Sequence, residues 1–203
     1  MHSRRLLNQT ALAALFGLVP GLSAAQSPSD ARWQVTQSGN GTRYLIYSAT
    51  ASVLGKPVAH QVTFFCNPHS TRTEKGMLGL EVRFNQVSVL KAFPFDAFEG
   101  PDATTHGKKL LRLTVIRPGQ PDAHMNTDVN GWTPDTQQFT FGTAADSQAA
   151  RSTERTLLQA LAHDADSLRI TITHPRDPNT TLAVQVPVAA RRGDFKALLE
   201  GLK

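Results

Sequence analysis

The sequence predicts a mostly β protein of the α+β class: an antiparallel, sandwich-like domain with one helix near residues 147–165 and a short helix at the C-terminus. Apolar and polar residues alternate in several short segments, which is typical of strands with one buried face. The period changes to that of a helix only in the last third of the chain. The connections between strands lack helical crossovers, so we expect antiparallel pairing.

The N-terminal residues have the features of a secretory signal peptide over residues 1–25. Arg4 and Arg5 form a basic start, residues 6–22 are mostly apolar, and Ser23-Ala24-Ala25 is a small-residue cleavage site. The apolar run is interrupted and falls short of the roughly 20 residues of a membrane span. We therefore expect a periplasmic or secreted protein, not inserted in the membrane, with one β-rich domain over residues 26–203. A buried N-terminal helix of the mature fold is the alternative.

The strands are predicted from strict alternation that ends at turn-forming residues. The clearest cover residues 58–66, 78–85 and 111–116, with shorter strands at residues 44–48 and 138–142. Gly39-Asn40-Gly41 predicts a tight turn between the first two strands.

The C-terminal third combines helices with a hairpin. Leu157, Leu158, Leu161 and Ala165 form one stripe of the helix expected at 147–165. A hairpin follows, with strands at residues 168–173 and 182–188 around a turn at 175–179. Asp194 is the expected N-cap of the last helix. Its apolar face should dock on the sheet, because so short a helix is unstable alone. That face consists of Phe195, Leu198, Leu199 and Leu202.

Charge and cysteine content restrict the possible partners and chemistry. The chain has 21 basic and 16 acidic residues, and its basic runs are no longer than two residues, so nucleic acid is a poor candidate partner. Cys66 is the only cysteine and cannot form an internal disulfide. It lies on the apolar strand face with His60, which predicts a buried, inert thiol and a core histidine. Pairing of Cys66 with another chain is the alternative.

The C-terminal pattern also resembles a known family. Leu-Leu-x-Ala-Leu at 157–161, the segment at 165–172 and Phe-Lys-Ala-Leu-Leu at 195–199 are similar to the C-terminal half of type VI secretion-associated accessory proteins, which are small exported bacterial proteins. Residues 64–67 and 128–132 fall where that family has a strand-end cysteine and an acidic–tryptophan segment. The resemblance implies a second cysteine near the C-terminus, and this chain lacks it. The resemblance bears on fold and compartment more than on a role in secretion.

No sequence motif of catalysis or cofactor binding is present. The chain has no Gly-x-Ser-x-Gly elbow, His-Glu-x-x-His pair or glycine-rich phosphate loop, and its histidines are scattered. We therefore predict no cofactor and no metal.

The segment 93–102 is the most unusual local feature, because it interleaves phenylalanines with acids. One interpretation is a protruding loop that contacts a partner, since loops on rigid β scaffolds often carry binding. The other is a connection whose phenylalanines cover the core while its acids face water. Its acids could offer oxygen ligands to calcium, but their spacing matches no standard calcium loop. The candidate residues are Phe95, Asp96, Phe98, Glu99 and Asp102.

Trp132 is the second candidate for binding. It lies between the turn dipeptide Asn130-Gly131 and Pro134, which predicts a partly exposed loop position. Tryptophan is enriched at binding hot spots and also stacks on sugar rings. Capping of the sandwich by Trp132 is the alternative.

Two classes of function follow from these residues. The first is a non-catalytic periplasmic binding protein, an accessory or inhibitor/immunity-type factor that engages a protein partner. The second is a periplasmic hydrolase of cell-wall or glycan material, with a catalytic pair among Asp96, Glu99 and Asp135. The first is favoured because no acid is flanked by the apolar residues that would raise its pKa.

Overall fold

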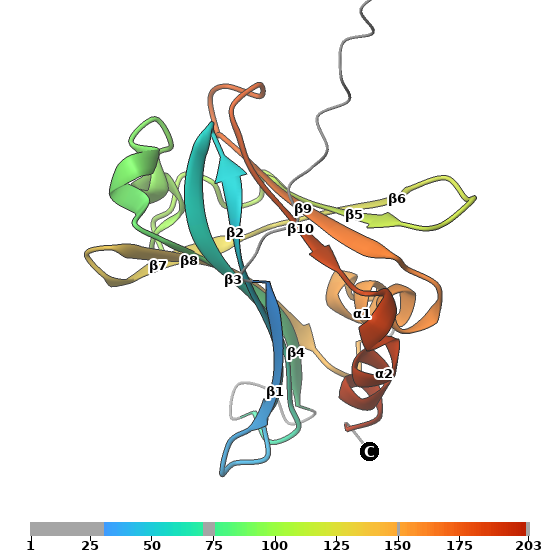
Figure 1. Ribbon diagram of the computed structural model, residues 1–203. Coiled ribbons are helices and arrows are strands. Elements are labelled where there is room, and N and C mark those ends of the chain that lie inside the picture. The colour runs from blue at the N-terminus through green and yellow to red at the C-terminus, as the bar shows by residue number, and fades with distance from the viewer. Residues whose placement is uncertain (1–30, 71–75, 150, 202–203) are drawn as a thin grey trace, which may run out of the picture.

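The computed structural model describes residues 31–70, 76–149 and 151–201, and it contains two antiparallel sheets and two α-helices (Figure 1). The predicted fold class is confirmed, and the two-sheet arrangement is consistent with a β-sandwich. The signal peptide expected at residues 1–25 lies outside the described residues.

The larger sheet has six strands in the order β1-β2-β3-β4-β8-β7. Their bounds are β1 Arg32–Gln37, β2 Arg43–Val53, β3 Lys56–Asn67, β4 Met77–Asn85, β8 Gln138–Asp146 and β7 Asn130–Asp135. The first four strands follow the chain as a meander. β8 then pairs with β4 across a long stretch of sequence, so β4 lies in the interior of the sheet.

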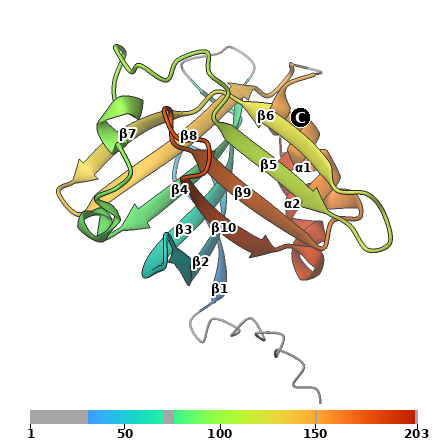
Figure 2. The same cartoon turned by 90° about the horizontal axis from the view of Figure 1, so that it is seen from above.

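The smaller sheet has four strands in the order β10-β9-β5-β6. Their bounds are β10 Thr181–Pro187, β9 Ser167–Thr173, β5 Leu111–Ile116 and β6 Ala123–Thr127. Figure 2 shows the strands of both sheets from above, with the helices beside the smaller sheet. The predicted C-terminal hairpin is the β9–β10 pair, in continuous register from Ser167↔Pro187 to Thr173↔Thr181.

The core lies between the inner faces of the sheets, and the helices close one end of it. Helix α1, Thr153–His163, packs on β8 and β4 of one sheet and on β5 and β6 of the other. Helix α2, Arg192–Glu200, packs on α1, β2 and β3. The alternating residues of β3 that the sequence assigned to one face are buried as expected: Val58, His60, Val62, Phe64 and Cys66.

The helix boundaries differ from the prediction at both ends of α1, which stops at His163, and at the start of α2. β8 continues to Asp146 and α1 begins only at Thr153, because Ser152 accepts a hydrogen bond from the backbone N of Arg155 and caps the helix. Asp194 is not the N-cap of α2. The chain enters that helix from the 3-10 turn Ala189–Arg191, so Arg191 occupies the cap position. Asp194 lies in the first turn, where it pairs with Arg191 at 2.8 Å.

Cys66 is a free, buried thiol at the end of β3. Burial raises its pKa to about 11, with the charge of Arg43 acting in the opposite direction. The thiolate is the reactive form of cysteine, so we expect native Cys66 to react with a polar thiol reagent far more slowly than the urea-unfolded protein does. Timed labelling read by mass spectrometry tests this. Equal rates in the two states, or a dimer dissolved by reductant, would contradict it.

Candidate binding site

The segment 93–102 folds over one end of the core. Phe93 and Phe98 are buried, with ring centroids 5.6 Å apart. Phe95 is half-buried against Phe139, at a centroid distance of 4.9 Å. The candidates Phe95 and Phe98 therefore belong to the core packing, and Phe98 has no free surface for a partner. The candidates Asp96, Glu99 and Asp102 are exposed, as the core-covering interpretation requires.

This segment and the segment of Trp132 meet at one edge of the larger sheet. The Glu99 carboxylate accepts a hydrogen bond from the backbone N of Thr133 at 3.1 Å, and Glu99 forms an isolated parallel bridge with Gly131. Glu99 thus covers part of the edge strand β7, whose N–H groups would otherwise be unpaired. The tertiary structure thus brings together the segments of two candidates, Glu99 and Trp132, which are 33 residues apart in sequence. The contact is structural, because Glu99 satisfies a backbone group of β7.

Trp132 lies on strand β7 and not in a loop, which corrects the prediction. Pro134 is tolerated there because β7 is an edge strand, and its pairing with β8 is irregular between Trp132 and Asp135. Trp132 is 39% exposed and is not part of the core cluster, so it does not cap the sandwich. Its ring lies over Gly142 of β8, where an added Cβ would be 2.8 Å from two ring atoms.

A second aromatic ring lies on the same outer face of the sheet. Phe65 is on β3 between the inward residues Phe64 and Cys66, and it is buried without joining the core cluster. Its ring lies over Gly79 of β4, where an added Cβ would clash with the ring atoms. Two glycines therefore let two rings from different strands lie flat against the sheet.

Glu81 lies between these two rings. It pairs with Gly142 on β8, beneath Trp132, and follows Gly79 by two residues on β4. Its Cγ is 3.6 Å from the position of a Cβ at Gly142. The three side chains line one hollow of about 690 Å³, which we call the aromatic hollow. Its lining also includes Thr42, Tyr44, Asn67, Met77, Asn130, Gly142, Thr143, Ala144, Ala145 and Asp146.

The aromatic hollow is acidic. Its described lining contains the carboxylates of Glu81 and Asp146 and no lysine, arginine or histidine. Burial raises the pKa of Glu81, and the nearby charge of Arg83 lowers it in part. No ion pair to Glu81 forms within the part of the chain that the structure describes. The carboxylate is therefore partly desolvated and forms no salt bridge with the described residues.

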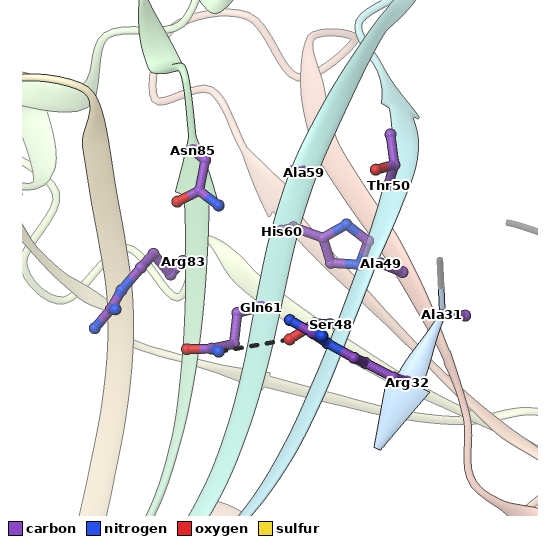
Figure 3. A pocket seen from close by; sticks show the side chains of 10 residues that line it. All are labelled: Ala31, Arg32, Ser48, Ala49, Thr50, Ala59, His60, Gln61, Arg83 and Asn85. Atoms are coloured by element: carbon purple, nitrogen blue, oxygen red, sulfur yellow. Dashed lines mark hydrogen bonds between the residues drawn. The ribbon is translucent and has the colours of Figure 1, made fainter. Parts of the chain in front are cut away.

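A second hollow on the same sheet has the opposite character. Figure 3 shows Arg32, from β1, reaching across β2 toward Ser48 and Gln61. Gln61 donates to Ser48 Oγ at 3.5 Å, and Arg83 Nε donates to Thr140 Oγ1 at 3.3 Å. Its described lining contains two arginines and no acid. The sheet thus separates a basic end from an acidic, aromatic end.

The fold and the aromatic hollow can be compared with those of known proteins. No family model, curated protein or solved structure matches this chain. None of the described helices is long and apolar enough to cross a membrane. Among the described residues, no three histidine, cysteine or acidic side chains gather where a metal ion could bind, and this includes Asp96, Glu99 and Asp102.

The acids considered for hydrolysis lie outside the aromatic hollow. Asp96, Glu99 and Asp135 are exposed, and none of them lines the aromatic hollow. Glu99 is hydrogen-bonded to β7, and Asp135 accepts a hydrogen bond from the backbone N of Gln137 at 2.8 Å.

Sequence reasoning missed Glu81, the acid whose pKa is raised by burial. In the alternation of residues 78–85 it stands at an outward position, which predicts a solvated side chain. The available signal was Gly79, because a glycine inside a strand often marks a close approach by another group.

Proposed function

We propose that this protein is an exported, non-catalytic binding protein, an accessory or inhibitor-type factor, that engages a protein partner through the aromatic hollow. The observation that carries the proposal is Trp132, a large ring that stays 39% exposed while it is held over Gly142 on a strand. Partly exposed tryptophans of this kind are the typical anchors of protein interfaces. Anchors on strands bind well because their position is set before the partner arrives.

The proposed compartment depends on the signal-peptide pattern of residues 1–25 and on the resemblance to exported accessory proteins. The proposed mode of binding depends on the geometry of the outer face alone. Asp96 and Asp102 remain exposed and can lie at the periphery of an interface, whereas Phe98 cannot.

The experiment is capture of partners from a periplasmic extract by the tagged protein and its variants. We expect Trp132→Ala to reduce partner retention at least ~10-fold, the loss that corresponds to ~1.4 kcal/mol of binding free energy. The melting temperature should change little, since exposed substitutions usually shift stability by no more than ~0.5 kcal/mol.

The matched control is Val35→Ala, which truncates another exposed apolar side chain on the opposite edge strand, β1. It should retain the partner fully. Equal retention by wild type and Trp132→Ala would place the interface elsewhere and contradict the proposal.

Hydrolysis of cell-wall or glycan material is the second candidate function. Glu81 favours it specifically, because its raised pKa is a property of general acids, and tryptophan rings bind sugars. Asp146 is the other carboxylate of the same hollow. Release of soluble fragments from purified peptidoglycan by wild type, abolished in Glu81→Gln, would establish hydrolysis in place of binding alone.

A further inference from the structure

We infer that the partner inserts a lysine or arginine side chain into the aromatic hollow, where its charged group pairs with Glu81 and its stem lies against Trp132 and Phe65. This inference rests on the proposed function and deepens it, since it gives the chemical class of the group that is recognised. Three observations support it: the geometry of the rings, the distribution of charge and the stability cost of Glu81.

The rings are arranged as two walls with a carboxylate between them. Trp132 covers Gly142 on β8, and Phe65 covers Gly79 on the adjacent strand β4. Glu81 is also on β4, where it pairs with Gly142. Tyr44 extends the Phe65 wall, at a ring-centroid distance of 6.4 Å. Aromatic faces attract a cation within ~6 Å of the ring centroid, and the long stems of lysine and arginine pack on apolar surface.

The acidic lining of the hollow favours a positively charged group as its occupant. Glu81 and Asp146 are the carboxylates of its described lining, which contains no lysine, arginine or histidine. The nearest base along β4, Arg83, is engaged with Thr140 at 3.3 Å and lines the other hollow. An anionic group would be repelled, and a neutral group would leave Glu81 desolvated and unpaired. A cation supplies the counter-charge that the described part of the chain does not bring within ion-pair distance.

Glu81 costs the fold stability instead of supporting it. Because its pKa is higher in the folded state, the folded protein holds the proton more tightly than the unfolded chain does. Above that pKa the ionised group therefore opposes folding. A destabilising carboxylate beside the exposed ring of Trp132 is typical of a binding group, since natural proteins trade stability for function at such positions.

The test uses tripeptides that differ only in the central side chain. The probes are acetyl-Gly-X-Gly-amide with lysine, arginine, norleucine or glutamate at X. Trp33→Phe serves as background because the chain has two tryptophans, so the fluorescence then reports Trp132 alone. We expect the lysine and arginine peptides to bind and to quench or shift that fluorescence, with at least ~10-fold weaker binding of norleucine.

The decisive variant is Glu81→Gln in the same background. It should reduce basic-peptide binding to the norleucine level while the melting temperature stays equal or rises. The matched control is Asp122→Asn, an exposed acid in the β5–β6 connection, which should leave basic-peptide binding unchanged.

Several results would overturn the inference. Equal binding of lysine and norleucine peptides would make the hollow a purely apolar site, and a fall in melting temperature with Glu81→Gln would make Glu81 structural. A dimer that depends on Glu81, without peptide binding, would identify a second copy as the occupant. If Trp132→Ala loses partner capture but the wild-type protein binds none of the peptides, the inference of a basic side chain is wrong. The proposed function then still holds. If Trp132→Ala captures the partner as well as the wild-type protein does, the proposed function is wrong.

Discussion

Phe195→Ala is expected to lower the free energy of unfolding by ~3–5 kcal/mol, the usual cost of removing a buried phenylalanine ring. Phe195 is fully buried. Its ring meets Phe64 of β3 edge-on at 4.9 Å and Trp33 of β1 at 6.1 Å, measured between centroids. Phe195 therefore attaches α2 to the inner face of the larger sheet. The nine-residue helix has little stability of its own, so loss of this contact should undock it.

Thermal and urea denaturation of the purified variant measure this effect. At ~2–4 °C per kcal/mol for a domain of this size, the melting temperature should fall by about 10 °C. Lys196→Ala is the control on the same helix: it removes an exposed side chain and its 4.0 Å ion pair with Glu200. Such a surface pair is worth at most ~1 kcal/mol. A Phe195→Ala loss no larger than that of Lys196→Ala would show that α2 does not dock.

The protein should also lose stability as the pH falls below about 6.5, because of His60. This histidine is 3% exposed between the rings of Tyr47 and Phe84, and neither ring nitrogen has a hydrogen-bond partner among the described residues. Burial lowers its pKa from the ordinary 6.5, with the Val58 backbone acting in the opposite direction. The unfolded chain therefore takes up the proton at a higher pH than the folded protein does.

The direction of the pH effect follows from this difference in proton uptake. Above pH 6.5 both states hold a neutral imidazole and stability is at its full value. Below it, protonation favours the unfolded state until the folded pKa is reached. We expect a progressive loss of stability over this pH range, because burial disfavours the charged imidazole in the folded state. His60→Leu should remove this part of the pH dependence.

Urea denaturation at a series of pH values between 7.5 and about 5 compares the variants. Taking the difference between wild type and His60→Leu removes the contribution of Glu81, whose raised pKa acts in the opposite direction. His69→Gln, at an exposed histidine near the end of β3, is the control and should follow the wild-type profile. An unchanged pH profile in His60→Leu would show that His60 does not titrate differently in the two states.

Local periodicity was enough to predict most of the core. Residues 58–66, 78–85 and 111–116 became strands with the expected inward side chains, since burial on one face imposes period two on the sequence itself. The helical stripe through Leu157, Leu158 and Leu161 and the docking residues Phe195 and Leu198 are buried for the same reason. These features depend on neighbours within a few residues along the chain.

The aromatic hollow is formed by contacts between strands that are distant in sequence, which local periodicity cannot predict. Glu81 lies beside Trp132 only because β8 pairs with β4 and β7 pairs with β8, in the registers Glu81↔Gly142 and Trp132↔Thr140. Asn130-Gly131 and Pro134 resembled a loop, but the edge position of β7 accommodates the proline. The sequence by itself determined which faces of strands and helices are buried. Only the tertiary structure decided which outward side chains meet, because strand order and register are set by pairing between distant segments.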